Sequence, residues 1–220
     1  MPAPAAILVP TKIELELLEP HLKQFRAIGT PIELCGWGPV VAAARTSQII
    51  GQLPETQIRS KGSPDSAPAF LLLIGIAGVL PASKLSSGNA YLFDSCVLDG
   101  VGVGIGEKHQ SAKELGWQLW PELGDILQTS DNAPNGLQLL TVCSASADPS
   151  EAEARQTKFP AADAEDMETY AVATSAYMHQ HQLKVIRGIS NQAGFRDHRR
   201  WKIEESLEAA AKLAIEMYLP

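Results

Sequence analysis

The chain has 220 residues, a formal net charge of −7 at pH 7 and 45% hydrophobic residues. This length suits one domain with a sizeable core, and we expect a single domain over residues 1–220. The acidic balance argues against binding to nucleic acid or to an anionic membrane, because both present negative phosphate groups.

No apolar run approaches the ~20 residues that a membrane-spanning helix needs, and the first residues carry no basic segment typical of export signals. The three cysteines, Cys35, Cys96 and Cys143, are far apart and form no CxxC pair. Such cysteines are typical of reduced thiols in a cytoplasmic protein rather than of a disulfide framework or a zinc site. We therefore expect a cytoplasmic protein.

Short apolar runs alternate with helical patterns in the first third of the chain. In chain order we predict a strand over residues 6–10, a helix over 12–26, a strand over 31–34, an alanine-rich helix over 40–52 and an exposed loop over 54–68. A buried strand over residues 70–74 follows. The sequence Gly-Ile-Ala-Gly at 75–78 is either a place where a ligand can approach the backbone N–H donors or a tight turn.

The rest of the chain continues the alternation. We predict strands over residues 89–93, 95–103 and 137–142, a loop over 129–136, a helix from 165 to about 182, a strand over 185–189 and an amphipathic segment over 197–219. Strands alternating with helices indicate a three-layer α/β/α sandwich, and the consecutive strands of the middle section indicate a mixed sheet.

Two acidic residues stand where a ligand could bind. Glu14 lies in the sequence Thr-Lys-Ile-Glu at 11–14, which is a capping-box pattern with Thr11 at the N-cap. It also lies at a strand-to-helix junction, where ligands bind in α/β sheets. Glu168 has a small, mostly apolar helical face, so it is either a first-turn acid near the helix dipole or a carboxylate held in the interior by partners.

Asn191 follows the predicted strand over residues 185–189. We expect a helix start and the far end of the strand that it feeds to lie at opposite edges of a sheet. A common pocket for Glu168 and Asn191 would therefore require a bent or crossing arrangement.

Several other motifs are absent or do not fit. The glycines of residues 100–106 alternate and do not form a GxGxxG turn that opens a helix. No GxSxG elbow is present, and the five histidines have no spacing suited to a metal site. We expect neither a metal nor a cofactor.

Together these pieces resemble the nucleoside phosphorylase and nucleosidase superfamily. The resemblance rests on Asp-Met-Glu at 166–168, Arg-Gly-Ile-Ser-Asn at 187–191, Glu14 after the first strand, and the glycine-containing segments at 36–39 and 75–78. It implies a nucleoside phosphorylase-like sandwich. Within the superfamily the chain most resembles the futalosine hydrolases, through Ser190-Asn191 and the stretch that contains Arg196 and Trp201.

The resemblance also implies roles for individual residues. Glu14 would activate the attacking water, and Arg187 would orient that water or its carboxylate partner. Glu168 would hold the ribose hydroxyls with Met167 packed on the sugar, while Ile76, Ala77 and Gly78 would border the substrate. Phosphorylases would show a Gly-Asp-Pro-x-Arg phosphate loop after the first strand, and residues 9–13 here read Val-Pro-Thr-Lys-Ile. Water is therefore the expected nucleophile.

The amide of Asn191 points to the leaving base. An aspartic acid can donate a proton to purine N7, whereas an amide can only donate a hydrogen bond. A 6-oxopurine offers acceptors at both N7 and O6, which suits an amide NH2, and hypoxanthine is therefore the expected base. The expected substrate is a small-molecule nucleoside, futalosine.

Three points stay open in the sequence. The arginines at 196, 199 and 200 are either a solvated surface patch or, with Arg196 first, a site for the carboxylate of the substrate. The aromatic residue that would stack on the base is Phe159, Phe195 or Trp201. The alternatives are a methylthioadenosine/S-adenosylhomocysteine nucleosidase, a phosphorylase and a catalytically silent nucleoside-binding protein. The resemblance implies a homo-oligomer.

Overall fold

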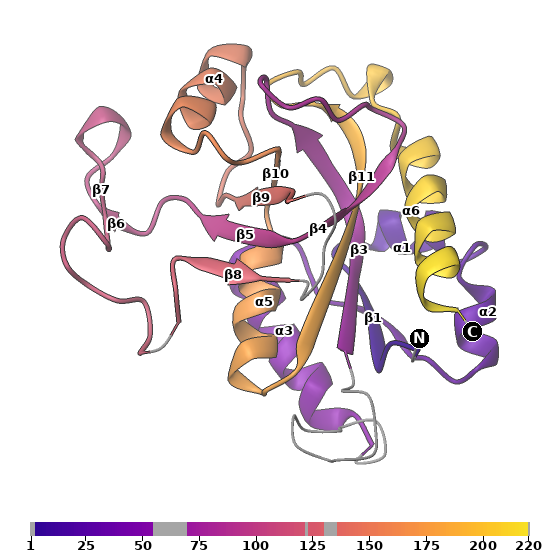
Figure 1. Cartoon of the computed structure of the whole chain (residues 1–220). Coiled ribbons are helices and arrows are strands. Elements are labelled where there is room, and N and C mark those ends of the chain that lie inside the picture. Colours follow the sequence, from indigo (N-terminus) through magenta and orange to yellow (C-terminus); the bar gives the residue numbers. More distant parts are fainter. Residues whose placement is uncertain (1–2, 55–69, 122, 130–135, 220) are drawn as a thin grey trace.

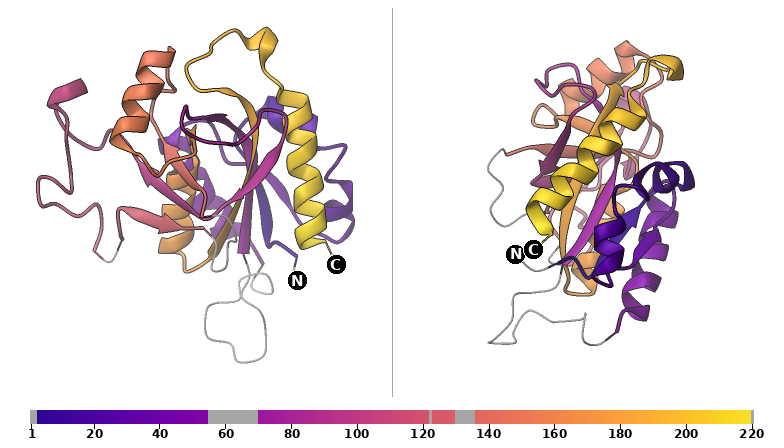
Figure 2. Two further views of the ribbon diagram at one scale, coloured as in Figure 1. Left: turned by 45° about the horizontal axis from the view of Figure 1, so that its top comes forward. Right: turned by 90° about the vertical axis from the view of Figure 1, so that its right-hand side faces the viewer.

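The computed structural model describes residues 3–54, 70–121, 123–129 and 136–219. Most of the predicted loops over 54–68 and 129–136 lies outside these residues. The described chain has a mixed β-sheet between two layers of helices (Figures 1 and 2), which confirms the predicted α/β/α sandwich.

The strands are β1 (Ala6–Val9), β2 (Ile32–Leu34), β3 (Phe70–Val79), β4 (Ala90–Phe93), β5 (Ser95–Leu98), β6 (Gly102–Val103), β7 (Gln110–Ser111), β8 (Ile126–Gln128), β9 (Gln138–Thr141), β10 (Ala164–Asp166) and β11 (Gln182–Gln192). The helices are α1 (Lys12–Leu18), α2 (Lys23–Ala27), α3 (Pro39–Gln52), α4 (Pro149–Lys158), α5 (Thr169–Met178) and α6 (Ile203–Tyr218), with short 3-10 turns at Gly106–Lys108 and His198–Arg200.

Strand β3 is the centre of the sheet and the point where the sheet divides. On one side it pairs along its whole length with the parallel strand β11. On its other side the first half pairs with β1, as far as Leu73, and the far end pairs with β10, at Gly78 and Val79. Between these two partners a short stretch of β3 around Gly75 has a free edge. This fork opens the sheet where the candidate site is found.

The alternation of apolar side chains along β3 supplies a core to each layer of helices. Leu71 and Leu73 face the core that contains residues of α3 and α5, whereas Leu72 and Ile74 face the core that contains residues of α1, α2 and α6. Successive side chains of a strand point to opposite faces, so a continuous apolar run is what a sheet covered on both faces requires.

Two predicted helices differ from those observed. The helix expected over residues 12–26 is two short helices, α1 and α2, because Pro20 lies between them and has no backbone N–H to donate. The helix expected from residue 165 begins only at Thr169, and it ends at Met178 rather than near 182. Residues 164–166 form strand β10 instead, since they pair with both β9 and β3.

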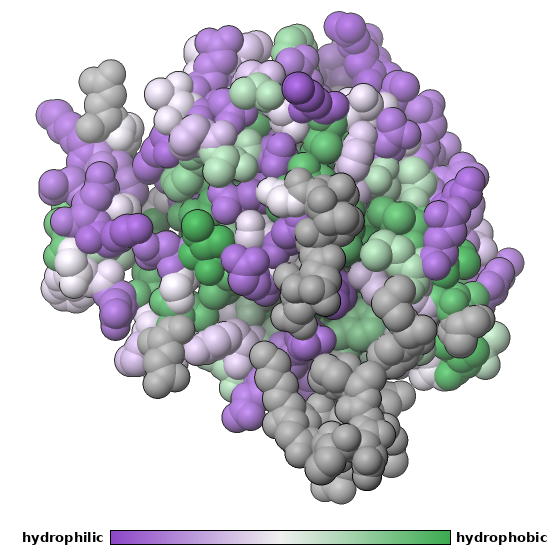
Figure 3. All heavy atoms as spheres, viewed as in Figure 1, coloured by the Kyte–Doolittle hydropathy of each residue, from purple (hydrophilic) through white to green (hydrophobic). Residues whose placement is uncertain are grey.

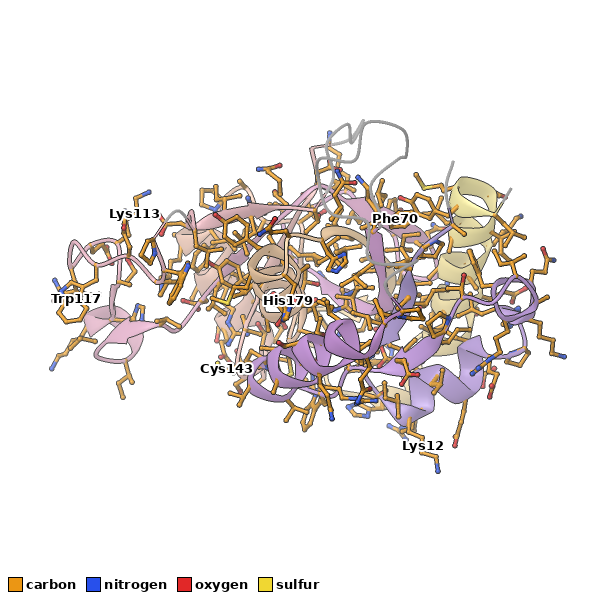
Figure 4. The ribbon with its side chains drawn as sticks, turned by 90° about the horizontal axis from the view of Figure 1, so that it is seen from below. Lys12, Phe70, Lys113, Trp117, Cys143 and His179 are labelled. Carbon is orange, nitrogen blue, oxygen red and sulfur yellow. The ribbon has the colours of Figure 1, made fainter. Side chains whose placement is uncertain are left out.

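The glycine-containing segment at 75–78 is not a turn. It continues β3 to Val79 in register with β11, and Gly75 stands opposite Arg187. The expected strand over 95–103 ends at Leu98, and a short hairpin of β6 and β7 follows as an arm on the left of Figure 1. Figure 4 shows Lys113 and Trp117 at the outer end of this arm.

The expectation that Glu168 and Asn191 would lie at opposite edges is wrong. In Figure 1, α5 descends and β11 then rises beside it, so the start of the helix and the end of the strand lie toward the same end of the sheet. A helix that leads directly into a strand and packs beside it runs antiparallel to that strand, so no bent or crossing arrangement is needed. Hydrophilic residues gather around this upper end of the molecule (Figure 3). Within the described part of the chain, no helix is long and apolar enough to cross a membrane.

Candidate active site

Glu14 both caps a helix and reaches into the fork of the sheet. Its Oε2 accepts hydrogen bonds from Thr11 N at 3.0 Å and Thr11 Oγ1 at 2.5 Å, and Thr11 Oγ1 accepts from Glu14 N, so the predicted capping box is present. Its Oε1 accepts from Ile76 N at 2.9 Å, at the free edge of β3. The two readings left open by the sequence are therefore compatible, and the cap fixes the carboxylate beside β3.

Arg187 is the largest fully buried side chain, and two acids hold it. Its Nη2 lies 2.5 Å from Asp166 Oδ2 and 3.3 Å from Glu168 Oε2, and it also donates to Thr169 Oγ1 at 3.2 Å. A buried guanidinium requires such charged partners, because an unpaired buried ion is costly. The first turn of α5 and strand β10 thus anchor the arginine of β11.

Two further donors of Arg187, Nε and Nη1, are buried and find no hydrogen-bond partner among the described residues. Nη1 points toward Gly75, where an added Cβ would lie 2.2 Å from Nη1 and 2.8 Å from Glu14 Oε1. Gly75 is therefore required by space, since only a residue without a side chain lets the guanidinium and the carboxylate approach the same point of β3. Buried donors without partners are uncommon, and a ligand or water that accepts from Nε and Nη1 would satisfy them.

Glu168 is the N-cap residue of α5, but its side chain does not cap that helix. Instead its Oε1 accepts from Gly38 N at 3.1 Å, at the start of α3, where the helix dipole favours a negative charge. Burial raises the pKa of Glu168 to about 7; Arg187 opposes this shift, while Asp166 and Glu14 add to it. The predicted first-turn acid is in fact a buried carboxylate held by partners from other elements.

The electrostatics of the cluster are dominated by acids. Burial alone would lower the pKa of Arg187, yet the carboxylates of Asp166, Glu168 and Glu14 raise it above its usual range, so the guanidinium is charged. Burial raises the pKa of the neighbouring Cys35 to about 12, so that thiol is protonated. The site therefore contains one permanent cation and several acids of which Glu168 can change its charge near neutral pH.

Asn191 lies further along β11, where a bulge shifts the register so that it stands opposite Gly78. Ser190 Oγ donates to Asn191 Oδ1 at 2.8 Å, and Asn191 Nδ2 donates to Gln192 O at 2.9 Å. These bonds fix the amide with its NH2 group on the side of Gly78, where an added Cβ would lie 3.4 Å from Nδ2. One hydrogen of the NH2 remains free to meet a ligand.

The other residues predicted to bind substrate differ in how deeply they are buried. Ile76 donates its backbone N–H to Glu14, Ala77 is buried in the core beside α3 and α5, and Met167 packs against a small cluster that includes Ala193. Arg196 lies outside this group: it is exposed, and its guanidinium lies 5.0 Å from the centre of the Trp201 ring.

The basic cluster precedes α6 rather than opening it, since His198–Arg200 is a separate 3-10 turn. Within the cluster, Arg199 makes two contacts with Asp197. Of the aromatic residues considered for stacking on a base, Phe195 is exposed, and Trp201 Nε1 donates to its carbonyl at 2.8 Å.

Sequence reasoning assigned no role to Asp166, which is the closest partner of Arg187. Asp166 Oδ1 accepts from Thr141 Oγ1 at 2.7 Å, and its Oδ2 accepts from Thr169 N at 3.1 Å. Asp166 is the last residue of β10 and Glu168 is the N-cap residue of α5, so both acids reach Arg187 from the junction between this strand and this helix. That junction could not be located from the sequence, which predicted a helix from residue 165.

Two hollows of about 190 and 280 Å³ lie elsewhere in the molecule. The first is lined by residues such as Leu127, His181 and Lys184, and the second by residues such as Pro31, Ile49 and Leu53. Neither is lined by a predicted site residue. The candidate site is therefore located by its charged and hydrogen-bonding side chains and not by the volume of a cavity. Among the residues that the structure describes, no group of three or more His, Cys, Asp or Glu side chains could hold a metal ion.

Comparison with known proteins supplies a family. The model of the phosphorylase superfamily matches residues 31–218. No curated protein matches the chain.

Several solved structures share the fold over nearly the whole chain. The Helicobacter pylori nucleosidase MTAN, as a mutant with 5'-methylthioadenosine in its active site, is 18% identical with a TM-score of 0.72, covering 99% of this chain and 98% of that one. The futalosine hydrolase of Helicobacter pylori is 16% identical with a TM-score of 0.70, covering 94% and 93%.

The 5'-methylthioadenosine/S-adenosylhomocysteine nucleosidase of Neisseria meningitidis, in complex with methylthio-immucillin-A, is 17% identical with a TM-score of 0.69, covering 95% and 96%. At such identities the likeness shows the fold alone.

Proposed function

Because the chain belongs to the phosphorylase superfamily, we propose that it is a purine nucleosidase that hydrolyses the N-glycosidic bond of futalosine and releases hypoxanthine. The products would be the free base and dehypoxanthine futalosine. The reaction requires water and no cofactor.

The observation that carries this proposal is the pairing of Glu14 with Arg187 across Gly75. Glu14 Oε1 accepts a single hydrogen bond, from Ile76 N, and keeps a second lone pair. Arg187 Nη1 borders the same point and has no partner among the described side chains and backbone groups. A water held between an acceptor and a donor is oriented for attack and can lose its proton to Glu14.

Glu168 supports binding of the sugar. Its carboxylate is buried beside Arg187, and it can accept hydrogen bonds from the ribose hydroxyls when ionised. Cleavage of the N-glycosidic bond passes through an oxocarbenium-like sugar, and a carboxylate fixed near the ring stabilises the positive charge that develops. Met167 would pack on the sugar at the mouth of this group.

Asn191 supports hypoxanthine as the leaving base. Its Oδ1 already accepts from Ser190, so the free N–H of its NH2 group is the part offered to a ligand. Purine N7 and O6 of a 6-oxopurine are acceptors that this N–H can meet. Adenine presents an amino donor beside N7 and is a poorer match.

The charges favour water over phosphate as the nucleophile. Glu14, Asp166 and Glu168 surround a single arginine, and a phosphate dianion entering this group would meet repulsion from the acids. The first residue of the α1 junction, Thr11, donates its backbone N–H to Glu14, so that donor is already used. A phosphorylase is therefore the less favoured reading.

Arg196 is the proposed contact for the benzoate carboxylate of futalosine. It follows the end of β11, five residues after Asn191, and it carries its charge on the surface beside Trp201. Arg199 is engaged with Asp197, so Arg196 is the better donor of the two. An Arg196→Ala protein with an unchanged KM for futalosine would contradict this contact.

One experiment separates the candidate activities. The protein is incubated with futalosine, inosine and 5'-methylthioadenosine, with and without phosphate, and the released base is identified by chromatography. Hypoxanthine released from futalosine without phosphate supports the proposal. Adenine release indicates a methylthioadenosine nucleosidase, dependence on phosphate indicates a phosphorylase, and binding without turnover indicates a nucleoside-binding protein.

A further inference from the structure

A second group of buried charges lies outside the cluster around Arg187. Glu165, on β10, is buried, and the side chain of Arg155, on α4, is only 12% exposed. Arg155 Nη1 lies 2.9 Å from Glu165 Oε2. None of the roles proposed above uses either residue, yet keeping two charged groups away from water requires a compensating arrangement.

This ion pair holds the loop of residues 144–148 by several bonds. Ser146 donates both its N–H and its hydroxyl to Glu165, at 2.8 and 2.7 Å, and Arg155 Nη1 donates to Ser146 Oγ at 2.8 Å. Arg155 Nη2 donates to Ser144 O at 2.6 Å and to Glu151 Oε1 at 2.9 Å. The planar guanidinium thus holds the loop at two points, through Nη1 at Ser146 and through Nη2 at Ser144.

The loop lies beside the end of β11 that carries Asn191. Glu165 and Asn191 stand opposite Gly78 on its two sides, since β10 and β11 flank the far end of β3. Gly194 packs directly on the loop, because an added Cβ would lie 2.4 Å from Asp148 O. The loop is therefore fixed against the same strand end that presents the amide of Asn191.

We propose that Arg155 and Glu165 are positioning residues that hold loop 144–148 as one wall of the base-binding pocket. The inference rests on the proposed function, since it takes Asn191 to face the base. A loop that is already fixed by an ion pair does not have to be ordered when the base binds. Its ordering therefore costs no binding free energy, and the pocket keeps a shape suited to one class of base. Arg155 and Glu165 act through the loop and do not touch the substrate.

The test compares Arg155→Lys with a matched control, Arg26→Lys. Arg26 also forms an ion pair with a glutamate at 2.9 Å, but on the surface of α2, away from the site. A lysine at 155 keeps the charge but cannot hold both Ser144 and Ser146, because its ammonium is a single point of donation. We expect Arg155→Lys to raise the KM for futalosine by about tenfold or more and to leave kcat within about threefold, which is the signature of lost uniform binding.

A second readout does not depend on turnover. Cys143 is the exposed cysteine and directly precedes the loop, whereas Cys35 and Cys96 are buried (Cys143 is labelled in Figure 4). The rate at which a thiol reagent such as Ellman's reagent labels Cys143 therefore reports on the loop. We expect labelling to be at least about fivefold faster in Arg155→Lys and unchanged in Arg26→Lys, because a released loop opens locally more often.

The outcomes are distinct. A folded Arg155→Lys protein with unchanged KM and labelling rate overturns the proposal, and so does a fall in kcat with KM unchanged. If Arg155→Lys does not fold, Ser146→Ala decides, since it removes the hydroxyl that Arg155 and Glu165 share, and a wild-type KM and labelling rate in that variant overturn the proposal. If the wild-type protein cleaves no nucleoside, the proposed function has failed. In that case, unchanged labelling of Cys143 in Arg155→Lys would show that Arg155 does not hold the loop either.

Discussion

Glu168 lies 3.3 Å from Arg187, yet its pKa is raised to about 7 rather than lowered. Burial is the largest cause, and the neighbouring Asp166 and Glu14 add to the shift. Arg187 is the closest cation, but its Nη2 lies nearer to Asp166, at 2.5 Å, so its charge is shared. Glu168 is therefore an acid whose charge changes near neutral pH.

This raised pKa predicts a stability that falls as pH rises. The unfolded chain releases the proton of Glu168 near its usual pKa of 4.5, and the folded protein releases it near 7. The folded state holds the extra proton between these values, so its stabilising effect is complete below about 4.5 and is lost as pH rises through about 7. The loss is on the order of 3 to 4 kcal/mol, from ~1.4 kcal/mol per pKa unit.

Urea unfolding of the wild-type and Glu168→Gln proteins between pH 5 and 8 measures this effect. We expect the variant to lack the decline. His181 acts in the opposite sense, because burial lowers its pKa and its folded state loses stability as pH falls. His181→Gln is therefore the control, because it removes the opposite dependence of stability on pH. If the free energies of unfolding of the wild-type and Glu168→Gln proteins changed with pH in parallel, the raised pKa of Glu168 would be contradicted.

The apolar core of this fold can be predicted from sequence patterns. The site depends on contacts between residues that are far apart in the chain, which such patterns do not show. The apolar run of β3 and the Thr11–Glu14 cap are local signals, and both are confirmed. The family match confirms the predicted superfamily. Residues 165 and 166 belong to a strand and not to the start of the predicted helix, because their state is decided by tertiary pairing with β9 and β3 and not by a local pattern.

The closest partner of Arg187 depends on this strand as well. A strand at 164–166 places Asp166 beside Arg187, which a helix beginning at residue 165 does not suggest. The role of Gly75 could not be predicted either, because nothing in its neighbours reveals that Arg187 and Glu14 approach it from distant parts of the chain. The single-domain boundary, the cytoplasmic location and the homo-oligomeric state stay predictions.

Gly75→Ala should strongly reduce activity although it adds only a methyl group. The new Cβ would lie 2.2 Å from Arg187 Nη1 and 2.8 Å from Glu14 Oε1, so the buried guanidinium must move. We expect kcat/KM to fall by about 10² or more, since misplacing catalytic groups by about 1 Å has that effect.

Gly51→Ala is the matched control for Gly75→Ala. Gly51 lies in α3 with nothing within 4 Å of an added Cβ, and alanine there should leave activity unchanged and stabilise the helix by up to about 1 kcal/mol. Nucleosidase kinetics and thermal unfolding of both variants provide the comparison, and a Gly75→Ala protein with full activity would place the reaction elsewhere.

Glu14→Gln should remove the proposed base while retaining the helix cap. Glutamine can still accept from Thr11, as capping boxes with glutamine do, so we expect the melting temperature to change little. We expect kcat to fall by about 10²–10⁴, the usual contribution of a positioned base. Glu16→Gln, on the exposed side of the same helix where Glu16 pairs with Lys12, is the control and should behave as wild type. Undiminished turnover by Glu14→Gln would rule out Glu14 as the base.

Asn191→Asp should shift the preference of the enzyme from hypoxanthine toward adenine. A protonated carboxyl at this position can donate to N7, and its second oxygen can accept from the adenine amino group, which the present NH2 cannot do. We expect the ratio of kcat/KM for 5'-methylthioadenosine to that for futalosine to rise by about tenfold or more, the range of a single buried hydrogen bond. Asn89→Asp makes the same change at an exposed position beside β4 and should leave the ratio unaltered. An unaltered ratio in Asn191→Asp would mean that Asn191 does not face the base, because exchanging a donor for an acceptor at a contact atom must act on the two bases unequally.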